Sequence, residues 1–151
     1  MRTMILIAAS TLILAVTACG QSKKEVPANV TSAFSAKFSN VSKVKWSMEN
    51  DSEWEAEFKL NGKECSANFD NEGIWMETEY EVSVKDIPAA VKATLDKESA
   101  GYKIEESGIT ETAEGKVYEF VISKGETETE LLIDSDGNLK NKEQIKEEDE
   151  K

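Results

Sequence analysis

The chain has 151 residues, enough for one small domain with a core of its own. Its 30 Asp and Glu residues outnumber 18 Lys and Arg, and the resulting net charge of −12 argues against binding to nucleic acid or anionic lipid headgroups. It has no histidine and its only arginine is Arg2, which excludes a Ser-His-Asp or Cys-His catalytic arrangement.

The first 18 residues have the features of an export signal. Arg2 is followed by an apolar run over 4–16, shorter than the roughly 20 residues of a membrane-spanning helix. The run leads into Val16-Thr17-Ala18-Cys19, which is typical of a bacterial lipobox. We predict a signal peptide over 1–18 and a lipidated tether over 19–25. An ordinary signal peptide cut after Ala18 is the alternative.

In a lipobox the cysteine thiol carries the lipid, so we expect Cys19 to be the membrane attachment point. One acyl chain binds a membrane only marginally, so we expect multiple acylation, palmitate included. The predicted location is the bacterial cell envelope, lipid-anchored. Gly20, rather than Asp, after the cysteine favours the outer membrane facing the periplasm.

A short unit occurs twice in the rest of the chain. Val26-Pro27-Ala28-Asn29-Val30 recurs as Ile87-Pro88-Ala89-Ala90-Val91, and Phe69-Asp70-Asn71-Glu72-Gly73 recurs as Ile133-Asp134-Ser135-Asp136-Gly137. Each unit opens with a proline and with apolar residues four apart, which predicts an amphipathic helix. We place the domain at 26–140, with repeats over about 26–84 and 85–140.

After each helix the apolar period changes to two, which predicts half-buried strands separated by hairpin turns. The expected fold class is α+β: tandem duplicated helix-plus-antiparallel-meander units, two helices packed on one face of an antiparallel sheet of about six to eight strands. The acidic stretch 141–151 has too little apolar content to pack and is expected to be a disordered tail. The alternating residues include Val44, Trp46, Met48, Trp54, Ala56, Phe58, Leu60, Tyr118, Phe120 and Ile122.

Acidic residues occupy the opposite face of these strands. In the strand after Gly73, Trp75 alternates with Glu77 and Glu79, while Glu55 is on the polar face of an earlier strand. We therefore predict that Trp75, Glu77, Glu79 and Glu55 lie on an uncovered face and contact an unknown protein partner, because an exposed Trp among charges is typical of a binding hot spot. The alternative is that Trp75 packs on a lysine stem of a neighbouring strand.

Two acidic turns raise a second kind of function. Asp134-Ser135-Asp136-Gly137-Asn138 resembles part of an EF-hand loop, but this register puts Leu132 at the first ligand position, where an oxygen is essential. We interpret this turn and 70–73 as hairpin turns in which Asp caps its own backbone. We expect no catalytic residue, metal site or cofactor. An acidic cation- or small-ligand-binding protein of the periplasm is the alternative function.

These motifs resemble the PepSY-like, beta-lactamase-inhibitor-like (BLIP-like) periplasmic proteins of Gram-negative bacteria, over about residues 26–140. The resemblance implies helices packed on one face of an antiparallel sheet, in tandem copies. It also implies binding, and sometimes inhibition, of secreted enzymes through the uncovered sheet face. No inhibitory residue can be carried over to this chain. The matching segments are 26–30, Val44-Lys45-Trp46, Trp54-Glu55-Ala56-Glu57-Phe58, Phe69-Asp70-Asn71-Glu72-Gly73-Ile74-Trp75, 87–91 and 133–138.

Overall fold

The computed structural model describes residues 25–145, which form two helices and one eight-stranded antiparallel sheet. Each strand pairs with the next along the chain. The predicted α+β class and strand number are confirmed. The elements in chain order are α1 (Ala28–Lys37), β1 (Val44–Asn50), β2 (Glu53–Leu60), β3 (Lys63–Asp70), β4 (Trp75–Glu81), α2 (Ala89–Glu98), β5 (Lys103–Thr112), β6 (Gly115–Lys124), β7 (Thr127–Asp134) and β8 (Leu139–Gln144).

Both helices begin directly after a proline. Pro27 and Pro88 each have a φ of −58°, and their carbonyl oxygens accept the first N–H bonds of the helices. A proline suits this position because its ring presets φ and no N–H partner is needed there. Each helix has ten residues, and no helix in the described part of the chain is long and apolar enough to cross a bilayer. The helix residues buried against the sheet are Val30, Phe34, Val91 and Leu95.

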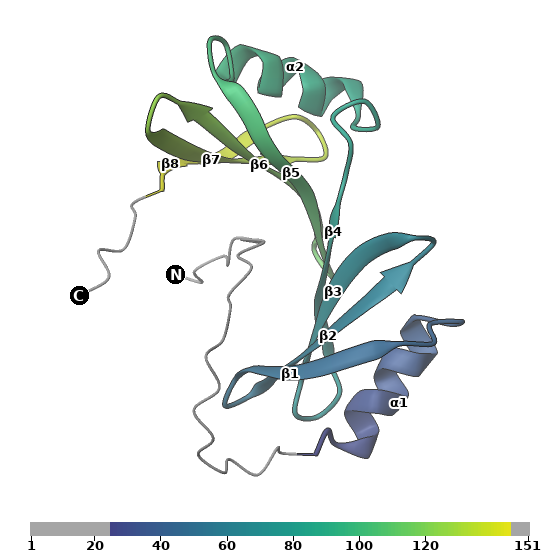
Figure 1. Ribbon diagram of the computed structural model, residues 1–151. Helices are drawn as coiled ribbons and strands as arrows, with labels where there is room; N and C mark the ends of the chain where they lie inside the picture. The colour runs from purple at the N-terminus through teal and green to yellow at the C-terminus, as the bar shows by residue number, and fades with distance from the viewer. Residues whose placement is uncertain (1–24, 146–151) are drawn as a thin grey trace, which may run out of the picture.

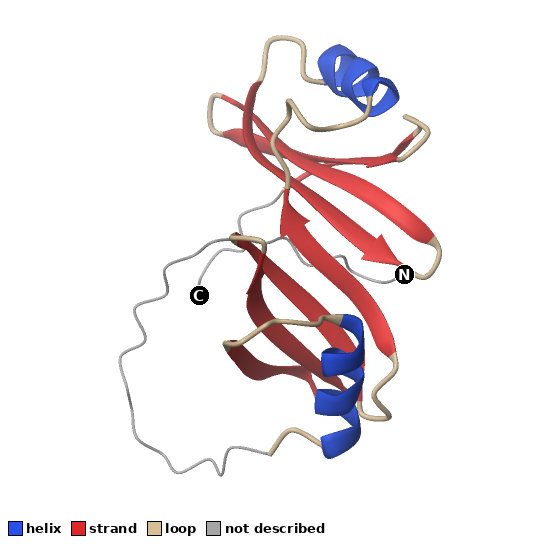
Figure 2. Ribbon diagram, turned by 90° about the vertical axis from the view of Figure 1, so that its right-hand side faces the viewer, coloured by secondary structure: helices blue, strands red, loops and turns tan. Residues whose placement is uncertain are grey.

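The two helices cover the same face of the sheet. Cross-strand partners point to one face, so a continuous row of them identifies that face throughout. The row under the helices consists of Phe58, Cys65, Tyr80, Ile109, Tyr118 and Ile133. Its first members pack with α1 and its last with α2. Figure 1 shows the helices on the outer side of the bent sheet, and Figure 2 shows them near its opposite ends.

Each helix has its own core, and the two cores differ in composition. Under α1 the core is aromatic, with the Phe34 ring centroid 5.0 Å from that of Phe58 and 5.4 Å from that of Trp46. Under α2 it is mainly aliphatic, with Leu95 and Leu131 fully buried. The two cores meet along β4 and β5, which pair through five residue pairs.

The ordered chain extends past the predicted end of the domain. Residues 141–144 pair with β7 as part of β8, and the Ile145 N–H donates to the Glu128 carbonyl at 2.9 Å. The prediction of a disordered tail from residue 141 is therefore wrong at its start, because backbone hydrogen bonds hold an edge strand without many apolar side chains. Residues 1–24, with the predicted signal peptide and most of the tether, and residues 146–151 lie outside the described part.

The two acidic turns contain the same hydrogen bonds. An oxygen of Asp70 accepts bonds from the backbone N–H groups two and four residues later, at 3.0 and 2.7 Å. Asp134 accepts the equivalent pair at 3.0 and 2.8 Å. Gly73 and Gly137 follow with φ of 82° and 86°. This confirms that these are hairpin turns in which Asp caps its own backbone.

The same glycines let each turn approach a helix closely. A Cβ atom on Gly73 would lie 2.8 Å from the Asn29 carbonyl oxygen, and one on Gly137 would lie 2.7 Å from that of Ala90. Both carbonyls belong to the first turn of a helix. Because these two glycines have no side chain, the first turn of each helix can lie directly against a hairpin turn of the sheet.

Replacing Gly73 or Gly137 by Ala should lower the free energy of unfolding by about 2–4 kcal/mol, because left-handed backbone strain adds to a backbone clash. Gly125→Ala is the control: its φ is 65°, but nothing lies within 4 Å of the added atom. Strain alone should cost that variant about 1 kcal/mol. Urea unfolding measures all three, and equal losses would contradict a role for the close approach.

Candidate binding face

The sheet face opposite the two helices, here called the open face, is strongly acidic. Its negative charge follows from the alternation of side chains along each strand. Apolar residues point toward the helices, and the residues between them, many of which are Glu, point to the open face. The acidic residues of the open face include Glu55, Glu57, Glu77, Glu79, Glu81, Glu106, Glu119 and Glu130.

Three of the four predicted contact residues come together on this face. Glu55 and Glu77 share one cross-strand row, with Asn68 between them, and Glu79 lies two residues further along β4. The Asn68 amide donates to the Glu77 carboxylate at 3.4 Å, and the Ser47 hydroxyl donates to Glu55 at 3.2 Å. The prediction that these three carboxylates share a face is correct.

Trp75 lies on the helix-covered face, so the face predicted for it is wrong. Asn68 pairs with Glu77 and the next residue, Phe69, pairs with Trp75, which leaves Met76 as one extra residue in β4. Such a β-bulge shifts the alternation by one position. Period-two reasoning fails here because it assumes an uninterrupted strand.

In its actual position Trp75 packs against the first core. Its indole N–H donates to the Thr78 hydroxyl at 2.9 Å, and the Lys37 ammonium lies 3.4 Å from the ring centroid. This is a cation–π contact with a helix residue, rather than packing on a lysine of a neighbouring strand. Trp75 therefore belongs to the junction of α1 with the sheet.

The second half of the sheet supplies open-face acids that sequence reasoning did not select. Glu119 follows Tyr118 and precedes Phe120, and both of these aromatic residues are buried beneath α2. The alternation Tyr118, Phe120, Ile122 was recognisable in the sequence and placed Glu119 on the other face. Glu106 could not be found in this way, because β5 contains a register shift between Ile104 and Glu106.

Burial shifts the ionisation of two open-face acids strongly. Burial raises the pKa of Glu79 to about 7, and the nearby carboxylates of Glu77 and Glu55 add to the shift. Burial also raises the pKa of Glu119 to about 8, with Glu130 as the main neighbouring charge. Both groups are half-buried, so the negative charge of each is disfavoured by partial loss of water and by the neighbouring carboxylates.

Lysine ion pairs on the open face lie toward its edges, at the β1–β3 end and at the start of β5, where Lys103 lies 2.6 Å from Glu105. Lys45 lies 3.3 Å from Glu57, and Lys59 lies 2.9 Å from Glu64. The Lys59 ion pair holds the pKa of Glu64 below its usual range. Within residues 25–145, no lysine lies within ion-pair distance of Glu79 or Glu119. The centre of the open face therefore lacks a compensating positive charge from the described residues.

The acidic turns do not offer a preformed cation site. The Asp134 carboxylate accepts hydrogen bonds from the Asn138 amide and from backbone N–H groups, which hold its pKa below its usual range. Within the described residues, no group of three or more His, Cys, Asp or Glu is arranged to hold a metal ion.

A carboxyl group whose pKa is raised by folding stabilises the fold only while it is protonated. That contribution is complete below the ordinary value of 4.5 and is lost as the pH rises through 7 and 8. We expect the free energy of unfolding to be roughly 1–3 kcal/mol lower at about pH 8.5 than at about pH 5. Urea unfolding at both pH values measures this difference, and equal or greater stability at the higher pH would contradict it.

Glu119→Gln should reduce this pH dependence and make the protein more stable than wild type at the higher pH. Glu64→Gln is the matched control, because Glu64 is exposed and paired with Lys59. It should keep the wild-type pH dependence.

Comparison with known proteins supports the fold assignment. The model of the beta-lactamase-inhibitor-like, PepSY-like family matches residues 52–141. A BLIP-like protein from Bacteroides fragilis NCTC 9343 is similar in structure, with a TM-score of 0.75 and 18% identity, over 84% of this chain and 92% of that one.

Two further structures are similar. A protein from Bacteroides eggerthii DSM 20697, described as periplasmic, has a TM-score of 0.74 and 17% identity over 80% of this chain and 90% of its own. A DUF2874 family protein from Bacteroides ovatus ATCC 8483 has a TM-score of 0.73 and 20% identity over 80% and 88% of the two chains. No match is found among curated proteins. The family match spans more than half of the sequence and coincides with the sheet, so this chain belongs to the beta-lactamase-inhibitor-like, PepSY-like family.

Proposed function

We propose that this protein is a non-enzymatic lipoprotein of the bacterial envelope that binds a protein partner through its open face. A secreted enzyme that it inhibits is the first candidate for the partner. The observation that carries the proposal is the placement of both helices on one face of a continuous sheet, with the other face left to Glu55, Glu77 and Glu79. Membership of a family described as beta-lactamase-inhibitor-like supports it.

An open antiparallel sheet face suits protein binding because its side chains stand in regular rows on a rigid backbone. The face is wide enough for side chains from many strands to contact one partner, as standard protein interfaces require. Its acids are held in place by hydrogen bonds from neighbouring strands, as for Glu55 and Glu77. Such preordering reduces the entropy lost when a partner binds.

The envelope location rests on the lipobox at 16–19 and on the similarity to a protein described as periplasmic. Lipid on Cys19 would place the domain close to a membrane surface, because only the tether over 19–25 separates them. The net charge of −12 would keep the domain off anionic headgroups and its open face accessible.

We also infer that the two halves, each a helix followed by four strands, derive from one duplicated unit. The equivalent hydrogen bonds at Asp70 and Asp134 support this, as do the matching contacts of Gly73 and Gly137 with helix starts. Gly73→Ala and Gly137→Ala should then destabilise the protein to a similar extent. A loss at one position only would count against equivalence.

Reversing charge on the open face should release the partner. The double substitution Glu55→Lys and Glu77→Lys should lower capture of an envelope protein in a pull-down by about tenfold or more. Glu72→Lys with Glu114→Lys is the matched control, since it makes the same charge change at exposed turn residues. Equal capture by the wild type and both double variants would remove the open face as the binding surface.

Cys19→Ala should abolish membrane attachment, because no other side chain in a lipobox can accept the diacylglycerol. We expect the variant to remain unprocessed or to appear in the soluble fraction, while Cys65→Ala leaves attachment unchanged. Membrane fractionation with detection of acyl groups measures both. Continued membrane fractionation of processed Cys19→Ala protein would contradict lipid anchoring at this residue.

A further inference from the structure

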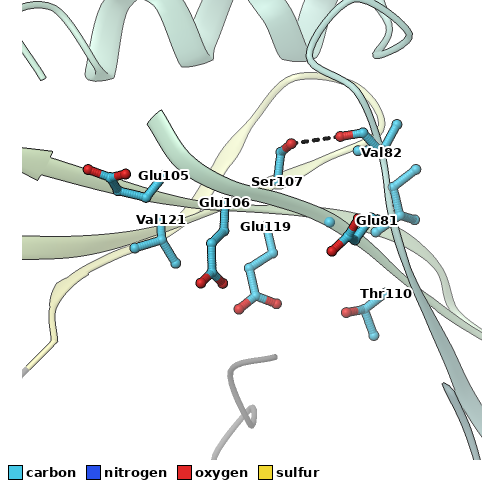
Figure 3. A pocket seen from close by; sticks show the side chains of 10 residues that line it. Glu81, Val82, Glu105, Glu106, Ser107, Thr110, Glu119 and Val121 are labelled. Carbon is cyan, nitrogen blue, oxygen red and sulfur yellow. Dashed lines mark hydrogen bonds between the residues drawn. The ribbon is translucent and has the colours of Figure 1, made fainter. Parts of the chain in front are cut away.

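The open face is hollowed in the second half of the sheet. A cavity of about 250 Å³ lies over β5 and β6. A volume of roughly 150 Å³ already accommodates a benzene ring, so this cavity has room for one long side chain. Figure 3 shows the Glu106 and Glu119 side chains side by side, pointing away from α2. The open-face residues that line the cavity include Glu81, Glu106, Gly108, Thr110, Glu119 and Val121.

Gly108 accounts for the hollow. It pairs with Glu81 of β4 on one side and with Glu119 of β6 on the other, so the position between two carboxylates has no side chain. A Cβ atom added there would have one neighbour within 4 Å, the Tyr80 carbonyl oxygen at 3.7 Å, which is an ordinary contact. A larger residue would therefore fit the backbone and occupy the cavity.

The cavity also contains a polar group that is available for hydrogen bonding. Thr110 is only 4% exposed, it lines the cavity, and its hydroxyl makes no hydrogen bond with another residue of the described range 25–145. Among the described residues no fully buried side-chain polar atom lacks a partner, so the Thr110 hydroxyl is accessible from the cavity, where it can bond to an incoming group. Val121, 5% exposed, adds an apolar wall beside it.

Negative groups face the cavity from every strand around it. Glu79 and Glu81 come from β4, Glu106 from β5, and Glu130 from β7. Lys103 of β5 already pairs at 2.6 Å with Glu105, which also lines the cavity, and Lys45 and Lys59 are paired at the β1–β2 end. An incoming positive charge would relieve the repulsion among these carboxylates.

We propose that the partner inserts a lysine or arginine side chain into this cavity, with its aliphatic stem against Val121 and its charged end at Glu119 and Thr110. A long apolar stem that ends in a multiple hydrogen-bond donor matches each wall of the cavity. The proposal rests on the proposed function, since it names the chemistry of the group that the open face recognises.

A pair of short peptides tests this directly. The unlipidated mature chain, Cys19→Ala over residues 19–151, is titrated with acetyl-Gly-Gly-Arg-Gly-Gly-amide and with the same peptide carrying citrulline, which is nearly isosteric but uncharged. NMR should show shifts at the amides of Gly108, Thr110 and Val121, with the arginine peptide binding about tenfold more tightly. Equal effects of both peptides, or shifts spread over the whole acidic face, would overturn the proposal.

Two substitutions separate the cavity from the general negative charge. Gly108→Val fills the cavity without changing any charge and should abolish the localised shifts. Glu119→Gln leaves the cavity open and should weaken arginine binding by about tenfold. Glu64→Gln removes a distant open-face charge and should have no effect. Undiminished binding by Gly108→Val, with its fold confirmed by its spectrum, would exclude the cavity.

Binding should also depend on pH. Glu79 and Glu119 hold protons near neutrality, and an incoming cation must displace them. We expect arginine-peptide affinity to rise about tenfold between about pH 6 and about pH 8.5, and this rise to shrink in Glu119→Gln. An affinity independent of pH over this range would contradict the placement of the cation.

Other occupants give distinct results. If Lys23→Gln with Lys24→Gln shifts the cavity amides before peptide is added, the chain's own tether occupies the site. If these amides shift with protein concentration, a second copy occupies it. Either outcome overturns the proposal.

The pull-down distinguishes failure of the cavity from failure of the open face. If the Glu55 and Glu77 double variant releases the partner but Gly108→Val does not, the open face is retained as the binding surface and the cavity is rejected. If both variants still capture the partner, the open face is rejected.

Discussion

The whole structure depends on one continuous antiparallel sheet whose two faces differ in chemistry. A single row of cross-strand partners, from Phe58 to Ile133, passes beneath both helices. Because neighbouring residues in a strand point to opposite faces, burying this row leaves the alternating carboxylates on the other side. With α1 and α2 on the same face, neither helix covers the acids. The acidic open face is thus a geometric consequence of how the core is formed.

The carboxylates of the open face repel one another, and two of them are also partly removed from water. Glu79 and Glu119 are half-buried among other carboxylates, and the raised pKa of each shows that its charged form is disfavoured. Replacing them by neutral residues would stabilise the isolated domain near neutral pH. Arrangements that reduce stability without an evident structural gain are typical of functional sites. The concentration of such groups near β4–β6 is a stronger indication of function than the total negative charge.

The candidate cavity requires both halves of the sheet. Glu81 belongs to β4, the last strand of the first half, whereas Gly108 and Glu119 belong to β5 and β6 of the second. These strands are joined by the five residue pairs between β4 and β5. Each half is itself locked to its helix through Gly73 or Gly137. The helices therefore hold the strands in place from the outer side of the sheet and leave the open face uncovered.

The sequence alone determined the elements, because period-four and period-two patterns and the proline and glycine positions act locally. It thereby predicted the two helices, the antiparallel sheet and the shared face of Glu55, Glu77 and Glu79. Only the tertiary structure decided the rest. The bulge at Met76 turned Trp75 toward Lys37, backbone pairing extended β8 past residue 140, and strand register brought Gly108 between Glu81 and Glu119. These features depend on pairing between distant residues, which no local pattern records.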